Sequence, residues 1–186
     1  MKEIRIHARA GQGAITAARI LAMAAFQQGK YALAFPHFGA ERMGAPMNAF
    51  VRMGSEKIRL RSRIHTPDYI LVVDPSLALS EEFGVFDGLK DDGAAIINFK
   101  GEATEFASRT AAKVWTVPAS EIAMEIIGQD RANMPILGGF AAATGELELP
   151  ALEKAIVENF GEGKIATKNI EAVRRAYDLV AARGKS

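Results

Sequence analysis

The chain contains no cysteine. A disulfide, a thiolate nucleophile, a cysteine-ligated zinc ion and a cysteine-held iron–sulfur cluster are therefore excluded on this chain. Histidine is also scarce, because only His7, His37 and His65 occur, in separate segments and without the paired spacing of a metal site. We expect no metal site here, so any metal or redox centre would belong to a partner.

An excess of charge of either sign is also lacking. The chain has 23 lysines and arginines against 22 aspartates and glutamates, so its formal net charge is only +1. This balance gives no general attraction to nucleic acid. No apolar run approaches the ~20 residues that span a bilayer, and the first residues do not follow the pattern of a secretory signal. We therefore expect a cytoplasmic protein with neither a nucleic acid nor a membrane partner.

The composition is that of a folded domain. Apolar residues make up 49% of the chain and charged residues 24%, which is ordinary for a globular protein. A chain of 186 residues can bury most of its apolar surface in one unit. We expect a single domain over residues 1–186.

Strand-like and helix-like patterns alternate along the chain. Five runs are typical of strands: Lys2–His7, Tyr31–Phe35, Tyr69–Val73, Ala94–Phe99 and Lys113–Val117. An apolar, alanine-rich helix is predicted from Ala14 to Gln28, and the chain beyond Pro118 is mainly helical. Together these patterns predict an α/β fold of three α/β/α layers, with a mostly parallel sheet and a helical C-terminal half.

An antiparallel hairpin is predicted between the second and third of these strands. Apolar and polar residues alternate in Met47–Met53 and again in Ile58–Ile64, around a turn at Gly54. Arg52 would then join a basic row with Arg59, Arg61 and Arg63 on one face. Such a row is either solvated or contacts an acidic partner or a phosphate group, and the sequence leaves both interpretations open.

The segment Gly11-Gln12-Gly13 follows the first strand and invites comparison with dinucleotide sites. A Rossmann motif needs G-x-G-x-x-G and a later carboxylate, but Thr16 occupies the third glycine position. We therefore expect no NAD site. Two interpretations remain: a tight strand-to-helix turn, or a turn whose backbone a ligand or partner approaches at the helix N-terminus.

The segment from Ala34 to Pro46 is the most distinctive part of the chain. It contains two prolines, two glycines, His37, Glu41 and Arg42, which is more than a simple chain reversal requires. We expect a shaped active-site or interface loop made of Pro36, His37, Phe38, Gly39, Glu41, Arg42, Gly44, Ala45 and Pro46. Glu41 and Arg42 form either a local ion pair or a contact across a subunit border.

Catalytic motifs are not evident. Neither a nucleophile elbow nor a phosphate-binding Walker loop occurs. We expect His7 to be a structural residue of a buried strand and His37 to be a loop residue rather than a base. No catalytic residue is predicted. In addition to the loop, the candidates for contact with a ligand or a partner are Gly11, Gln12, Gly13 and Arg52.

Taken together, these motifs resemble the gamma subunit, or domain III equivalent, of 2-oxoacid:ferredoxin oxidoreductases, most closely those for pyruvate. The family pattern is a G-x-G-G-Q-G turn, an alanine-rich helix, the loop F-P-x-F-G-P-E-R-R-G-A-P and a strand ending in arginine. The matching residues are Gly11-Gln12-Gly13, Phe35-Pro36, Phe38-Gly39, Glu41-Arg42, Gly44-Ala45-Pro46, Arg52, Pro67-Asp68 and Asp74-Pro75. Asn133 to Gly138 and Asn169 match more loosely.

The resemblance implies an enzyme subunit that holds no cofactor itself. The family decarboxylates a 2-oxoacid oxidatively to acyl-CoA and carbon dioxide and passes the electrons to ferredoxin. Thiamine diphosphate, Mg²⁺ and [4Fe–4S] clusters lie on the other subunits, so alpha, beta and delta-type partners are implied. The gamma chain is expected to help enclose the active site and the approach of coenzyme A.

Four departures from the family pattern matter for this reading. Ala8 and Ala10 replace glycines in the turn, which disfavours a close backbone approach there, and Ala40 and Met43 alter the loop. Two alternatives stay open: a related complex for an aromatic, branched-chain or 2-oxoglutarate substrate, or a free-standing α/β nucleotide-binding module.

Overall fold

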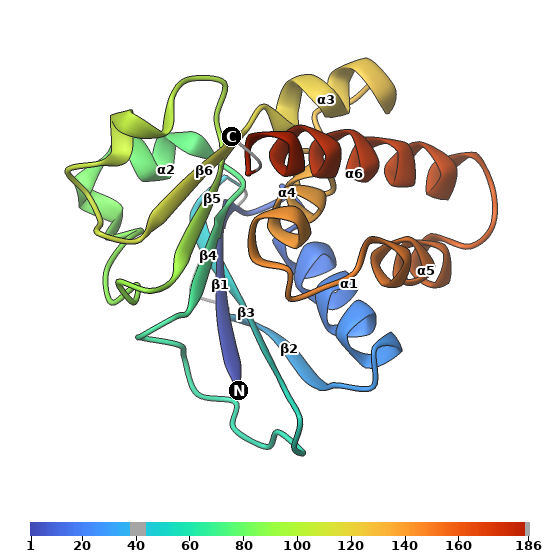
Figure 1. The fold of residues 1–186 in the computed structure, drawn as a ribbon, viewed down its shortest axis with the longest axis horizontal. Helices are drawn as coiled ribbons and strands as arrows, with labels where there is room; N and C mark the ends of the chain where they lie inside the picture. Colours follow the sequence, from blue (N-terminus) through green and yellow to red (C-terminus); the bar gives the residue numbers. More distant parts are fainter. Residues whose placement is uncertain (38–43, 185–186) are drawn as a thin grey trace.

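The computed structural model describes residues 1–37 and 44–184. Their strands form a six-stranded sheet in the order β2-β3-β1-β4-β5-β6 (Figure 1). The strands are β1 (Lys2–Arg9), β2 (Tyr31–His37), β3 (Pro46–Gly54), β4 (Tyr69–Val72), β5 (Ala94–Asn98) and β6 (Lys113–Val117). β1, β4, β5 and β6 pair in parallel, whereas β3 is antiparallel to both β1 and β2. The predicted, mostly parallel sheet is confirmed.

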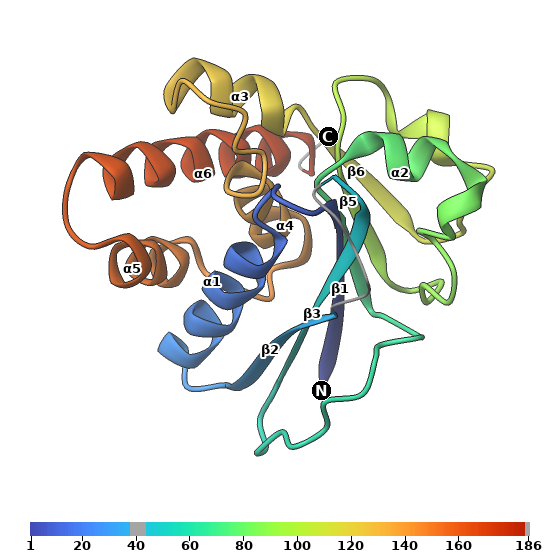
Figure 2. The same cartoon turned by 180° about the vertical axis from the view of Figure 1, so that it is seen from behind.

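Helices cover the two faces of this sheet unequally (Figure 1, Figure 2). One face carries α1 (Ala14–Gln27), α3 (Ala119–Ile126), α4 (Pro135–Thr144), α5 (Leu149–Phe160) and α6 (Lys164–Arg183). The other face carries α2 (Pro75–Leu79) and two 3₁₀ helices, η1 (Glu81–Phe83) and η2 (Ala103–Phe106). The three layers and the helical C-terminal half agree with the prediction.

The predicted hairpin is wrong in its second strand. Residues 58–64 form no strand, and the antiparallel hairpin is instead made by β2 and β3, with Tyr31 opposite Gly54. The carbonyl oxygens of Leu60 and Ser62 accept hydrogen bonds of 2.9 Å from Arg52. The Arg52 side chain thus binds two alternate carbonyl groups that would bind a neighbouring strand if residues 58–64 joined the sheet.

The predicted basic row is therefore wrong as well. The Arg52 side chain is buried, with 2% of its surface exposed, whereas Arg59, Arg61 and Arg63 are exposed. Alternation alone could not separate these two environments, because it does not show whether a second strand is present to define a common face.

Close packing of α4 on α6 depends on one glycine. A Cβ atom at Gly138 would overlap the backbone carbonyl oxygen of Val173 in α6, whereas a Cβ at Gly139 would lie 2.6 Å from a methyl group of Val117. We expect Gly138→Ala to lower the free energy of unfolding by about 3 kcal/mol, because two helix backbones must separate. Gly139→Ala should cost less, since a side chain can rotate away. Urea unfolding compares the two, and equal losses would contradict a backbone contact at Gly138.

Candidate functional site

The carboxyl ends of the parallel strands meet at one edge of the sheet, where the glycine turn lies. β1 leads into α1 on one face and β4 leads into α2 on the other face. A small pocket lies at this edge, lined among others by Gln12, Asp74 and Asn98 from the ends of β1, β4 and β5, the usual ligand position in open α/β sheets. Gln12 and Asp74 meet across it, because the Gln12 side-chain nitrogen donates a 2.8 Å hydrogen bond to the Asp74 carboxylate.

The turn after β1 requires glycine at two positions. Gly11 has φ +98° and Gly13 has φ +81°, in the region that side chains with a Cβ rarely adopt. No non-glycine residue within 1–37 or 44–184 has a positive φ, so Ala8 and Ala10 replace the family's glycines without strain. Gly13 precedes α1 without a side-chain cap, so no capping side chain accepts from the first amide groups of the helix.

Arg9 fixes this turn against its neighbours. Its Nε lies 3.3 Å from the Asp74 carboxylate, and its terminal nitrogens donate to the Ser76 hydroxyl (3.1 Å) and the Gly44 carbonyl (3.2 Å). Burial would raise the pKa of Asp74, but hydrogen bonds from Ser76 and Gln12 and the charge of Arg9 lower that pKa below its ordinary value. The ionised carboxylate therefore holds the turn in place.

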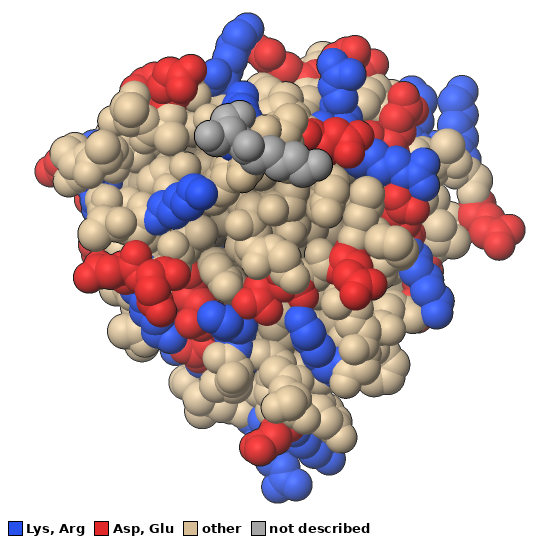
Figure 3. All heavy atoms as spheres, in the orientation of Figure 1, with Lys and Arg blue, Asp and Glu red and all other residues tan. Residues whose placement is uncertain are grey.

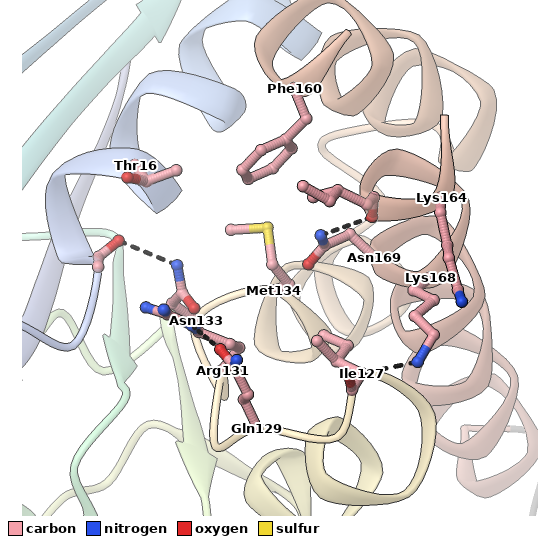
Figure 4. A pocket seen from close by; sticks show the side chains of 12 residues that line it. Thr16, Ile127, Gln129, Arg131, Asn133, Met134, Phe160, Lys164, Lys168 and Asn169 are labelled. Carbon is pink, nitrogen blue, oxygen red and sulfur yellow. Dashed lines mark hydrogen bonds between the residues drawn. The ribbon is translucent and has the colours of Figure 1, made fainter. Parts of the chain in front are cut away.

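A cavity of about 520 Å³ opens beside the turn (Figure 4). Its wall comes from the start of α1, the connection between α3 and α4, the end of α5 and the start of α6. Three cations, Arg131, Lys164 and Lys168, line it together with apolar surface from Phe160 and Met134. Lys168 Nζ is directed to the carbonyl oxygen of Ile127, at 3.4 Å.

Asn133 connects the cavity to the glycine turn. Its Nδ2 donates a 3.2 Å hydrogen bond to the carbonyl oxygen of Gly13, and a Cβ at Gly13 would overlap this amide group. Asn133 is 5% exposed, and its Oδ1 is buried with no hydrogen-bond partner among residues 1–37 and 44–184. An unpaired buried acceptor costs about 1–3 kcal/mol, so Asn133 is held in this position at the expense of stability.

These features suit an anionic ligand with a flat apolar part. The open N-terminus of α1 and the three cations attract phosphate groups, while Phe160, Met134 and Ile165 offer apolar contact. Over the part of the chain that the structure describes, no cluster of three or more histidine, aspartate or glutamate side chains is placed to hold a metal ion. The arrangement therefore provides binding through backbone amides, ammonium and guanidinium groups.

The predicted loop residues are partly incorporated into the sheet. Pro36 and His37 belong to β2, and Pro46 begins β3 opposite Arg9. Gly44 and Ala45 exchange backbone hydrogen bonds with Ala10, so this end of the loop lies against the glycine turn. The other predicted residues, Phe38, Gly39, Glu41 and Arg42, lie outside the described residues, as do the departures Ala40 and Met43.

Arg52, predicted as a possible contact to a ligand or a partner, lies inside the protein with 2% of its surface exposed. Its Nε is 2.7 Å from the Glu3 carboxylate, and its guanidinium group stacks 5.4 Å from the ring centre of Phe35. Arg52 thus stabilises the connection between β3 and β4 and does not contact a partner at the surface. Sequence reasoning missed Arg131, Lys164 and Lys168, and only the loose matches at Asn133 and Asn169 pointed to this part of the chain.

His7 is the structural residue that the sequence predicts. Its Nε2 accepts a 2.9 Å hydrogen bond from Arg5 Nε, and the side chain is buried. Burial, with a smaller contribution from the Arg5 charge, lowers the pKa of His7 to about 3. The neutral imidazole is therefore the form that the folded chain contains.

This burial predicts a loss of stability in acid. Below pH 6.5 the unfolded chain protonates His7 while the folded chain does not, so proton uptake favours unfolding until the pH reaches the folded pKa near 3. Between pH 7 and pH 5 we expect His7 to account for a loss of about 2 kcal/mol. Urea unfolding should show a flatter pH profile in His7→Gln, while the exposed His65→Gln keeps the wild-type slope. Parallel profiles for wild type and His7→Gln would contradict the buried neutral form.

Comparisons with known proteins agree over nearly the whole chain. The family model described as pyruvate ferredoxin/flavodoxin oxidoreductase matches residues 3–179. A pyruvate synthase subunit PorC from Methanothermobacter marburgensis is 48% identical over 178 residues, covering 96% of this chain and 97% of that protein. A common gamma subunit of pyruvate/ketoisovalerate oxidoreductases from Pyrococcus furiosus is 45% identical, covering 96% of both.

A solved structure agrees as well. Pyruvate oxidoreductase subunit PORC from Thermotoga maritima is 38% identical, has a TM-score of 0.84 and covers 95% of both chains. Within the described ranges, no helix combines the length and apolar character needed to cross a membrane.

Proposed function

This chain belongs to the pyruvate ferredoxin/flavodoxin oxidoreductase family and is a gamma-type subunit of such an oxidoreductase; we propose that its task in the complex is to bind coenzyme A beside the active site. The observation that carries this proposal is the cavity at the N-terminus of α1, with its three cations beside apolar surface. Phosphates meet the cations and the helix N-terminus, and Phe160 and Met134 offer apolar contact to the adenine ring.

The chain's own residues bind and orient in this proposal. Gly11 and Gly13 let the turn approach the ligand, Asn133 fixes Gly13, and Arg9 holds the turn against Gly44. Thiamine diphosphate with Mg²⁺ supplies the decarboxylation chemistry, and [4Fe–4S] clusters carry the electrons to ferredoxin. We assign the clusters to other subunits because the chain has no cysteine, and we assign thiamine diphosphate with Mg²⁺ to alpha, beta and delta-type subunits because the family resemblance implies it.

Reconstitution tests this proposal. The other subunits, purified without this chain, should lack coenzyme A-dependent oxidation of the 2-oxoacid, and adding the chain should restore it. The chain alone should bind neither iron nor thiamine diphosphate. Full coenzyme A-dependent turnover without the chain, or a visible cluster absorption in the chain itself, would contradict this assignment.

Pyruvate is the proposed substrate. The similarity to a subunit common to pyruvate and ketoisovalerate oxidoreductases favours a second candidate, a subunit shared with a branched-chain 2-oxoacid complex. A panel of pyruvate, 2-oxoisovalerate, 2-oxoglutarate and indolepyruvate on the assembled enzyme distinguishes these possibilities.

We also propose that Arg42 in the loop reaches a neighbouring subunit or the substrate channel. This proposal rests on the sequence, since arginine forms a bidentate fork with a carboxylate or phosphate that lysine cannot reproduce. Arg42→Lys should lower turnover of the assembled complex about 10- to 150-fold, as expected for losing about 1.5–3 kcal/mol, with the melting temperature unchanged. Arg175→Lys, at an exposed position of α6, is the control. Normal turnover in Arg42→Lys would leave Arg42 a local structural residue.

A further inference from the structure

The connection from β3 to β4 carries the densest group of cations in the chain. Residues 57–63 contain four of its 23 lysines and arginines, Lys57, Arg59, Arg61 and Arg63, and all four are exposed. We call this group the basic strip. Among residues 1–37 and 44–184, no carboxylate lies within 4.0 Å of these four cations, although nine other ion pairs are formed.

The basic strip is held in place by buried arginines. Arg52 and Arg5 are 2% and 7% exposed, and they donate hydrogen bonds to the carbonyl oxygens of Leu60, Ser62 and Ile64. Burying a guanidinium group is costly unless it is paired, and here carbonyl groups of the connection are among the hydrogen-bond partners of both guanidinium groups. The backbone that carries the exposed cations is therefore fixed before any partner binds, which lowers the entropy lost on association.

The basic strip lies far from the candidate coenzyme A site. Met53 pairs with Lys2, at the start of β1, and the connection then enters β4 at Tyr69, so it runs along the amino ends of the parallel strands. The glycine turn lies at their carboxyl ends. Figure 1 shows the connection at the lower end of the molecule, and Figure 3 shows Lys and Arg side chains projecting there, with Asp or Glu atoms beside them.

We propose that the basic strip is a docking surface for an acidic face of another subunit of the complex. This inference rests on the proposed function, because it takes the chain to be one subunit of a larger enzyme. Three of the four cations are arginines, which pair bidentately with carboxylates. Leu60 lies between them in the sequence and is 52% exposed, so it offers an apolar contact among the charged side chains. With a net charge of +1, the chain as a whole does not favour nucleic acid, whereas a local strip suits a local acidic face.

Charge reversal in the assembled enzyme tests this proposal. The triple variant Arg59→Glu/Arg61→Glu/Arg63→Glu is expressed with the other subunits and a tag on this chain. The control Lys113→Glu/Lys154→Glu/Arg175→Glu makes the same change in net charge at exposed positions elsewhere. We expect the strip variant to weaken co-purification at least tenfold, on the order of a 1.4 kcal/mol change, while the control assembles normally. Wild-type assembly should weaken with salt.

Each outcome decides between alternatives. Assembly of the strip variant like the control would overturn the docking proposal. If reversal instead abolished binding of a labelled RNA and left assembly intact, the strip would bind nucleic acid and the proposal would be wrong. Should the glutamate variant fail to fold by circular dichroism, the neutral Arg→Gln triple variant takes its place. Failure of the wild-type chain itself to assemble would refute the proposed function instead.

Discussion

Replacing Arg52 with methionine should lower the free energy of unfolding by about 3–5 kcal/mol, the cost of removing one partner of a buried ion pair. The Arg52 guanidinium lies 2.7 Å from the Glu3 carboxylate and donates to the carbonyl oxygens of Leu60 and Ser62. Methionine fills similar space but leaves a largely buried carboxylate and two carbonyl groups without their donor. Urea unfolding at neutral pH measures the loss.

One further variant tests the contribution of the unpaired Glu3 charge to this loss, and another is a control at an exposed arginine. Glu3→Gln in the Arg52→Met background should recover part of the loss, because the uncompensated charge is removed. Arg59→Met, at an exposed position of the basic strip, should change stability by less than about 0.5 kcal/mol. A loss in Arg52→Met no larger than in Arg59→Met would contradict the buried role of Arg52.

Arg52 also shows where sequence reasoning fails. Alternation of apolar and polar residues predicted β3 correctly, but the same pattern in residues 58–64 predicted a strand that does not form. Period-two patterns report an extended backbone with two different sides, and they do not report what binds its carbonyl groups. Here two arginine side chains from β1 and β3 do so, a tertiary arrangement that the local sequence does not encode.

The parallel strands were predictable for a different reason. The segments forming β4 and β5 are continuous apolar runs, and such runs are typical of strands covered on both faces. Each is fully buried between the two helical layers. The helical C-terminal half followed from its apolar spacing, although its division into α3, α4, α5 and α6 depends on packing between helices.

Only one wall of the candidate site, the glycine turn, was predicted from the sequence. Gly11 and Gly13 marked the turn, because the sequence between a strand and an apolar helix contained two glycines. The opposite wall comes from segments more than 100 residues away, and the hydrogen bond from Asn133 to Gly13 joins the two. Lys164 and Lys168 belong to α6, which carries many other charges, and Arg131 follows Asp130 in the connection before α4, so nothing local distinguished these three from solvated cations.

The cations of this wall provide the most direct test of coenzyme A binding. In the assembled enzyme, Arg131→Gln/Lys168→Gln should raise the KM for coenzyme A about 100-fold, since each charged hydrogen bond to phosphate contributes at least ~1.5 kcal/mol. The turnover number at saturating coenzyme A should change little, because these side chains hold the phosphates in both the ground state and the transition state. The KM for the 2-oxoacid should be unaffected.

A matched control keeps the test specific to the cavity. Lys154→Gln/Arg175→Gln removes the same charge from exposed positions on α5 and α6, so any general electrostatic attraction of coenzyme A is lowered equally. ADP should inhibit the wild type competitively against coenzyme A and inhibit the cavity variant far more weakly, because the ammonium and guanidinium groups would meet the same phosphates. If the KM for coenzyme A rose equally in both double variants, long-range charge rather than the cavity would account for the effect. If it rose in neither, coenzyme A would bind elsewhere in the complex.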